Sequence, residues 1–361
     1  MATYTSSLAP DNTTLTTFKA WATPISAFFA TCGWIQTSDT GQVVWTATVL
    51  TLTQVTVGAT AVYSYSSYTG PDPRIGMSVT VTGFGTGGNN VTATLTAVSG
   101  GASGTVTVAL STQSNETHSG SGTTTALAAV PGTGAYVYEI WKTGDSVGFD
   151  VYAKVEYGTN GSFATRASIA LSVGTGANGS GSLTNSSTRQ TTQSNSSVTT
   201  VLPCHLSGDS GRMTLLMFQA NTNQVFVFNL ERSYDNSGTP TGSYYNYAHI
   251  GPNGGSGIQQ SLFPTGAGTT TETGGFAAIV VKTATTGNVG STTCVSPIFP
   301  LIGGIGNPLT GIMVYRGHDF SDDQVVYITI YGVQQTYITN DVNSSAIPSN
   351  GQSSGYMARY S

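Results

Sequence analysis

Hydrophobic residues recur at three- and four-residue spacing in one part of the chain, residues 11–34, and this spacing predicts a helix. Thr23 and Pro24 interrupt it and predict a break, with Pro24 opening a second short helix, because proline lacks an amide hydrogen and fits best in a first helical turn. Gly33 stands where the end of a helix favours glycine. We expect the helix to cover the open end of a sheet, with docking to a partner protein as the alternative. The apolar positions are Leu15, Phe18, Trp21 or Ala22, Ile25, and Phe28 or Phe29.

From residue 41 onward, apolar and polar residues alternate in short runs that glycine or asparagine separates. A period of two is that of a β-strand with one buried face, and such runs pair through tight turns. We therefore predict a mainly β protein, with an antiparallel β-sandwich or barrel and an N-terminal helix. The strand runs outside residues 53–127 are 41–52, 167–176, 212–220, 224–235, 274–285, 307–317 and 324–339.

Residues 53–127 differ in texture from the rest of the chain. They contain no tryptophan and almost no charge, whereas aromatic residues are dense on either side. This change predicts a small β-sandwich module inserted into a host domain that comprises residues 1–52 and 128–361. Two domains in series are the alternative. The composition of residues 115–125 predicts a flexible hinge at the exit from the module.

Two further expectations concern the host domain. Its strands over residues 42–49 and 136–141 should be neighbours, because the two ends of an inserted module must lie close together. Residues 344–361 have little periodicity, which predicts a loop or an extended C-terminal arm.

The composition favours a folded chain that works inside an assembly. Charged residues make up 7% of the 361 residues, against about 25% in an ordinary domain, and the 10% of aromatic residues argues against disorder. The net charge of −5 gives no positive surface for nucleic acid or an anionic membrane, and no apolar run is long enough to cross a bilayer. A surface so poor in charge has little protection against association. We expect contacts between copies of the chain; a monomer solvated by hydroxyl groups is the alternative.

The sequence predicts neither a cofactor nor a disulfide framework. Cys32, Cys204 and Cys294 are odd in number and widely separated. Gly-Thr-Gly-Ala-Asn-Gly at 174–179 matches a dinucleotide fingerprint, but a polar loop follows where the fingerprint needs a helix. The acidic residues include no pair that stands out as a glycosidase site. No catalytic residue is therefore predicted.

Gly-Asp-Ser-Gly at 208–211 spells the surroundings of the nucleophile in chymotrypsin-like proteases. Catalysis would need a histidine oriented toward Ser210 and a buried aspartate. His118 lies in a Gly/Ser-rich stretch, and His205 is too near in sequence to fold back easily onto Ser210. Asp and Gly tolerate the dihedral angles of tight turns, so we predict a hairpin turn here.

Two weak ligand sites complete the set of candidates. A group of aspartates beside His318 could hold a calcium ion, although the EF-hand spacing is missing and a solvated turn is the alternative. A group of tyrosines could stack on sugar rings, or pack on the protein's own strands. The residues are Asp319, Asp322 and Asp323 for the metal ion, and Tyr244, Tyr245 and Tyr247 for the sugar.

Several stretches, in order along the host domain, are similar to structural proteins encoded among the tail genes of tailed bacteriophages. In those proteins the strand that contains Tyr-Glu-Ile-Trp follows shortly after the strand that contains Gly-Gln and a tryptophan. Here a long segment separates the two, which agrees with an insertion. The segment itself resembles small immunoglobulin-like β modules of phage and bacterial surfaces. The stretches are 18–45, 138–145, 152–160, 172–183, 207–218 and 228–242.

The resemblance implies a non-enzymatic structural protein of a tailed-phage virion, made in the bacterial cytoplasm and belonging to the tail tip, the baseplate or a fibre. Its partners would be copies of itself and other virion proteins, with no nucleic acid and no membrane insertion. A capsid decoration protein and a protein that binds host cell-surface glycan are the alternatives. The family pattern names no catalytic residue and treats the Ser210 stretch as a turn between strands.

Overall fold

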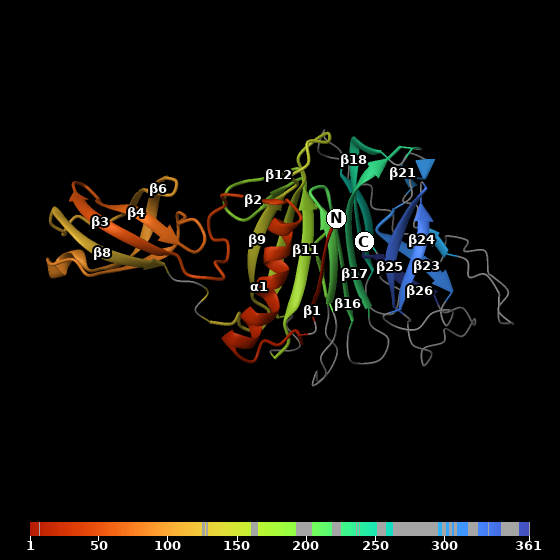
Figure 1. The fold of residues 1–361 in the computed structure, drawn as a ribbon, viewed down its shortest axis with the longest axis horizontal. Coiled ribbons are helices and arrows are strands. Elements are labelled where there is room, and N and C mark those ends of the chain that lie inside the picture. The colour runs from red at the N-terminus through yellow and green to blue at the C-terminus, as the bar shows by residue number, and fades with distance from the viewer. Residues whose placement is uncertain are drawn as a thin grey trace. The chain divides into compact units, whose positions relative to one another are not determined.

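The computed structural model divides the chain into two compact units, which are described separately. The host unit comprises Met1–Thr37, Pro131–Asn178 and Ser182–Ser361, and the inserted unit comprises Ser38–Val130 with Gly179–Gly181. Antiparallel sheets dominate both units (Figure 1), which confirms the mainly β prediction. The structure describes all residues except 7, 125, 126, 128, 160–164, 193–203, 219–224, 236, 238, 251–257, 263–294, 298–300, 303, 304, 307, 308, 317–323, 331, 341–353 and 361.

The inserted unit is a closed antiparallel barrel rather than the small sandwich expected. Its elements are β3 (Val49–Val57), β4 (Ala61–Thr69), β5 (Ser78–Thr82), η1 (Gly87–Asn89), β6 (Thr92–Gly100), β7 (Gly104–Val108) and β8 (Glu116–Thr124). The strands follow the order β3-β4-β7-β6-β5-β8, and β8 pairs with β3 to close the ring. Alternate residues point inward, so Leu50 and Leu52 are buried, and a register shift between Leu52 and Gln54 brings Val55 to the inner face as well.

Within residues 115–125, which were expected to be a flexible hinge, Glu116–Thr124 form the strand β8, and this corrects the expectation. β8 pairs with β3 on one side and β5 on the other. A Cβ at Gly120 would lie 2.7 Å from the ring of Phe84, and one at Gly122 would lie 3.2 Å from Leu52. Glycine is therefore needed at these two positions, because the side chains of Phe84 and Leu52 pack directly against the β8 backbone.

Three antiparallel sheets and two short hairpins build the host unit. The first sheet contains, in order, β1 (Ala2–Ser6), β15 (Cys204–Asp209), β16 (Arg212–Phe218), β17 (Val225–Tyr234), β18 (Pro240–Ile250) and β19 (Ile258–Leu262). The second contains β14 (Gln190–Thr191), β11 (Ser168–Gly174), β10 (Tyr152–Gly158), β9 (Tyr136–Lys142) and β2 (Ile35–Gln36). The third contains β20 (Val295–Pro297), β23 (Ile312–Arg316), β26 (Ser354–Arg359), β25 (Val333–Asn340) and β24 (Val325–Ile330). The hairpins are β12 (Gly176–Ala177) with β13 (Leu183–Thr184), and β21 (Leu301–Ile302) with β22 (Ile305–Gly306).

The strand pairings correct the expected start of the inserted unit, the expected neighbour of β9 and the expected form of the C-terminal residues. β3 pairs only with barrel strands, so the inserted unit begins before residue 53, and β2 takes the place beside β9 that was expected for residues 42–49. β26 lies between β23 and β25, so residues 354–359 are part of a sheet and not an arm.

A second short strand, and no helix, follows the glycine-rich stretch at 174–179.

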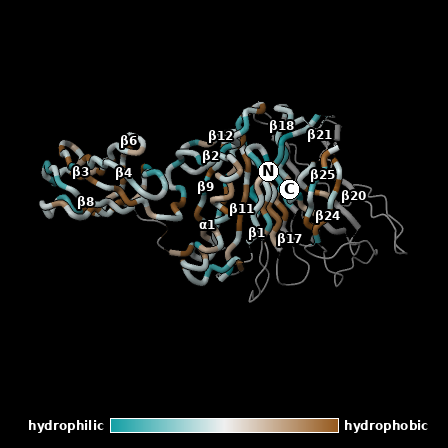
Figure 2. Tube along the Cα trace, in the orientation of Figure 1, coloured by the Kyte–Doolittle hydropathy of each residue, from teal (hydrophilic) through white to brown (hydrophobic). Residues whose placement is uncertain are grey.

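The one α-helix in the described part of the chain, α1 (Leu15–Thr31), packs on the edges of the first and second sheets. It contacts β1, β15 and β2. Trp21 meets Tyr157 of β10 edge-on, and Phe28 faces Tyr4 of β1. Its apolar face joins a core that includes the fully buried β11, whose hydrophobic run is visible in Figure 2. The helix thus packs on strands of two sheets, whereas the sequence analysis expected it to cover the open end of one sheet.

The ends of α1 follow its sequence, but its middle does not. Thr14 and Thr17 form a capping box at the start. At the other end Gly33 has a φ of +90°, and the amide of Trp34 donates to the carbonyl oxygen of Phe29 at 3.0 Å, as in a Schellman motif. Pro24 does not divide the helix as expected, because the loss of one hydrogen bond is offset by burial of residues on both sides.

Candidate functional site

The Gly-Asp-Ser-Gly stretch is the tight turn that the sequence predicted. Residues 210 and 211 connect β15 to β16. The carbonyl oxygen of Ser210 accepts hydrogen bonds at 2.9 and 3.2 Å from two amides that follow β9. His205 lies on β15 with its Nδ1 3.0 Å from Thr5 Oγ1, and His118 belongs to the other unit. The turn therefore holds a neighbouring loop in place.

Two of the three tyrosines considered for sugar binding lie in the core, which agrees with the alternative that they pack on the protein's own strands. Tyr245 and Tyr247 are both fully buried on β18. The Tyr247 hydroxyl donates to the carbonyl oxygen of Leu171 at 3.0 Å, and the ring of Tyr245 faces the guanidinium of Arg232. Positions two apart in a strand share a face, and here that face is the inner one. The side chain of Tyr244 lies outside the described part of the chain.

The acidic residues considered for calcium, Asp319, Asp322 and Asp323, also lie outside the described residues. Where the structure does describe the chain, no group of three or more His, Cys, Asp or Glu side chains is placed to hold a metal ion. Cys32 and Cys204 are free and buried, and burial raises the pKa of both thiols to about 12. Neither thiol is therefore a ready nucleophile at neutral pH.

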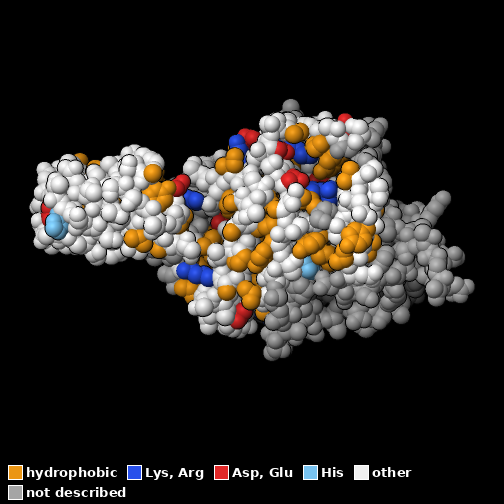
Figure 3. Space-filling model, viewed as in Figure 1, with side chains coloured by type: hydrophobic (Ala, Val, Ile, Leu, Met, Phe, Trp, Pro, Cys, Tyr) orange, Lys and Arg blue, Asp and Glu red, His pale blue; other side chains and the backbone are white. Residues whose placement is uncertain are grey.

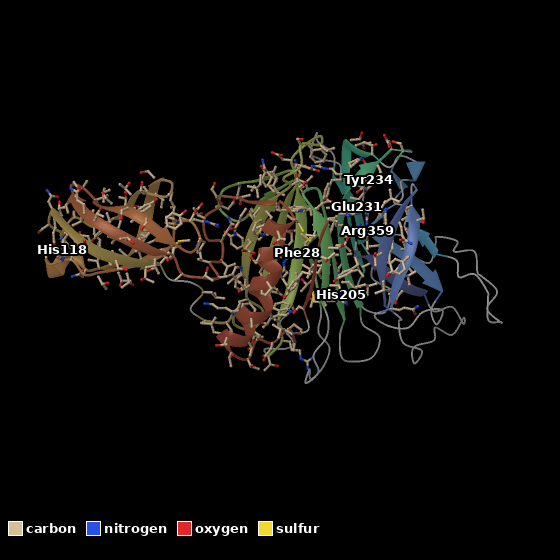
Figure 4. All side chains as sticks on the ribbon, in the orientation of Figure 1. Phe28, His118, His205, Glu231, Tyr234 and Arg359 are labelled. Carbon is tan, nitrogen blue, oxygen red and sulfur yellow. The ribbon has the colours of Figure 1, made fainter. Side chains whose placement is uncertain are left out.

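The densest group of ionisable side chains joins the first sheet to the third. Glu231, in β17, is fully buried. Its carboxylate accepts hydrogen bonds from the Thr310 amide at 2.7 Å, the Thr310 hydroxyl at 2.9 Å and the Gly311 amide at 3.2 Å. The Tyr337 hydroxyl donates to the Thr310 carbonyl oxygen at 2.6 Å, and the Arg359 amide donates to the Gly311 carbonyl oxygen at 2.9 Å. The chain just before β23 is thus fixed between the two sheets, where Figure 4 labels Glu231 and Arg359.

Charge within this group is balanced by arginine. Burial raises the pKa of Glu231, while the charge of Arg212 and the bonds from Thr310 act in the opposite direction. Burial, and then the neighbouring Arg212, lowers the pKa of Arg359. A carboxyl group with a raised pKa can serve as a catalytic acid where a substrate reaches it. Glu231 is closed to solvent, so the arrangement works as a structural tie between sheets.

A buried ion pair starts from the next residue along β17. Arg232 donates from Nε and Nη2 to the two carboxylate oxygens of Asp145, at 3.0 and 2.6 Å. Its other bonds reach the Phe149 carbonyl oxygen at 2.8 Å and the Thr143 hydroxyl at 3.2 Å. Two parallel bonds between a guanidinium and a carboxylate make a strong, directional pair. This pair fastens the connection between β9 and β10 to the first sheet.

Sequence reasoning did not single out Glu231, Arg212 or Arg232, although one signal was available. In a chain with 7% charged residues, Glu231 and Arg232 stand side by side within a strand that is otherwise largely apolar. Adjacent residues of a strand point to opposite faces, and a buried charge needs a partner. The pair therefore indicates packing on both faces of the first sheet.

Among the described residues, no helix is both long and apolar enough to cross a membrane. No protein-family model, no curated protein and no solved structure matches the chain.

Proposed function

We propose that the chain is a non-enzymatic structural protein of a tailed-phage virion, a tail component that works through β contacts with copies of itself. The sequence support is the set of stretches similar to phage tail proteins. Three of these stretches, 138–145, 152–160 and 207–218, coincide with β9, β10 and the β15–β16 hairpin. The resemblance therefore falls on strands that build the first and second sheets of the host unit.

The observation that carries the proposal is the use of the ionisable side chains. Glu231, Arg212 and Arg232 are buried, and they hold the chain's own elements together. The face shown in Figure 3 is mostly uncharged, in keeping with the composition. An enzyme needs ionisable groups that a substrate can reach. An assembly protein needs a firm framework and surfaces that do not repel one another.

Glycan binding has less support than a purely structural role. The host unit keeps Tyr245 and Tyr247 in its core, so these two tyrosines are not available for stacking on sugar rings. A glycan site on this chain would have to use other residues, and the inserted unit is the natural place to look for them.

Mass spectrometry of purified particles that carry this gene is expected to detect the chain. After tails and capsids are separated, the chain should follow the tails, in several copies for each tail, because symmetric homo-oligomers dominate protein assemblies. Recovery with the capsids alone would favour a decoration protein. Absence of the chain from the particles would contradict the proposal.

A further inference from the structure

Among the described strands, β24 lies at one edge of the third sheet. It pairs with β25 on one side, and no strand among the described residues pairs with its other side. Exposure alternates along it, with Val325 46% exposed and Tyr327 65% exposed. An unpaired backbone edge that also presents apolar side chains can receive an additional strand.

The other face of β24 carries an apolar row that the chain only half buries. The row consists of Val326, Ile328 and Ile330. Ile328 and Ile330 pack against the cluster that contains Tyr337 and Met357. The apolar layer of the third sheet therefore reaches the free edge and stops there incomplete.

The edge lacks the features that keep edges of monomeric proteins apart. Residues 324–340 include no charged residue and no proline. β24 and β25 pair in unbroken register, from Val325↔Ile338 to Ile330↔Val333. Proteins usually protect an exposed edge with lysine, proline or a β-bulge. Within Val325–Ile330 no charged residue repels a second copy of the strand, and none could pair with a charged partner.

We propose that β24 pairs antiparallel with β24 of a second copy, about a two-fold axis. The inference rests on the proposed function and deepens it by naming the surface of self-contact. Residues directly opposite in antiparallel strands point to the same face, so residues from the same face of each copy must meet. The register that uses the whole apolar row sets Ile328 opposite itself and Val326 opposite Ile330. Tyr327 then stands opposite Thr329.

The small area of this contact limits the affinity of two isolated chains for each other. One pair of short strands buries less than the roughly 1,200 Å² of a stable complex, so the isolated chains should associate weakly. In a particle, other contacts hold the copies together and raise the effective concentration of each edge. The pairing is thus completed on assembly.

Sedimentation equilibrium over a range of chain concentrations tests the surface. Tyr327→Lys should weaken self-association by about tenfold or more, because the two lysines would lie diagonally across the two-fold axis. Tyr327 is exposed, so the variant should fold, and its circular dichroism should match that of the unchanged chain. Thr96→Lys is the matched control, since Thr96 is exposed on β6 of the inserted unit.

A disulfide trap gives a readout even where association is weak. In a Cys294→Ser background, Ile328→Cys should form a disulfide-linked dimer on mild oxidation, because facing Cα atoms of paired strands lie within disulfide range. Thr96→Cys should not. The remaining natural thiols, Cys32 and Cys204, are buried.

A Tyr327→Lys chain that associates as well as the unchanged chain overturns the inference, and so does the absence of a dimer from Ile328→Cys. Where sedimentation detects no association of the unchanged chain, the disulfide result decides alone. These results leave the virion proposal standing, because the presence of the chain in the particles is tested separately.

Discussion

Replacing residues 41–129 with a flexible Gly/Ser linker of about 15 residues, ~50 Å when extended, is expected to leave a host unit that unfolds in one cooperative transition. The inserted unit has its own barrel core, and the three host sheets take no described strand from it. Differential scanning calorimetry should show the unfolding enthalpy reduced by about a quarter, because enthalpy scales with the number of residues that fold.

The length of the linker follows from the host unit itself. The amide of Thr37 donates to the carbonyl oxygen of Ile140 at 2.9 Å, and Pro131 precedes Ile140 by nine positions. The chain ends at Thr37 and Pro131 are therefore separated by at most ~37 Å, which is nine extended residues plus the ~5.5 Å between paired strand residues. The replacement keeps residues 38–40, because they hydrogen-bond with residues 179–181.

A matched deletion at the boundaries that the sequence suggested, residues 54–126, tests the same division of the chain. It retains the first part of β3 with Leu50 and Leu52, which are fully buried in the barrel. Without the barrel these side chains meet water, so lower solubility and a broader transition are expected. Equal behaviour of the two deletions, or loss of the host transition after the first one, would show that the units are divided wrongly.

Arg232→Ala is expected to lower the free energy of unfolding of the host unit by about 3–5 kcal/mol, as found when one partner of a buried ion pair is removed. The Arg232 side chain is 2% exposed and that of Asp145 is 14% exposed, so water can replace little of what is lost. The substitution also removes the bonds to the Phe149 carbonyl oxygen and the Thr143 hydroxyl. Denaturant unfolding followed by circular dichroism measures the change.

Two further variants separate a buried pair from an exposed one. Arg189 is 42% exposed and lies 2.6 Å from Glu156, so Arg189→Ala should cost no more than about 1 kcal/mol. Arg232→Lys should fall between the two alanine variants, because lysine keeps the charge but cannot make two parallel bonds to one carboxylate. If Arg232→Ala costs no more than Arg189→Ala, the ion pair does not hold the β9–β10 connection to the first sheet.

The helix could be predicted from sequence, whereas its continuity could not. The spacing of apolar residues located α1, and Gly33 located its end. Pro24 affects one hydrogen bond, but Trp21 and Ile25 on either side of it are buried in the same core. That packing depends on strands far away in the sequence, so the local pattern gave no sign of it.

The inserted unit could be anticipated, but its first boundary and its last strand could not. Strands of the host and of the barrel share the same period of two, so periodicity does not separate them. The composition changes only at residue 53, whereas β3 already pairs with barrel strands from Val49 onward. The Gly/Ser-rich stretch of β8 has the composition of a linker. Its glycines are set by the Phe84 and Leu52 side chains across the barrel, which only the closed fold brings there.

The partners of the buried charged side chains were the least predictable part of the candidate site. Glu231 and Arg232 are neighbours in one strand, but their partners Thr310 and Asp145 lie on distant segments. The tyrosines of β18 show the same limit, since an alternating aromatic run is compatible with an exposed face or an inner one. Burial against β11 decides between them.

The central claim, that the chain is a self-associating component of a virion, is tested most directly by a cryo-electron density map of the particle that carries this gene. Several copies of the chain are expected around a symmetry axis of the tail, with each copy in contact with identical copies. A single copy without contacts to identical chains, or a tail whose density is filled entirely by other proteins, would contradict it.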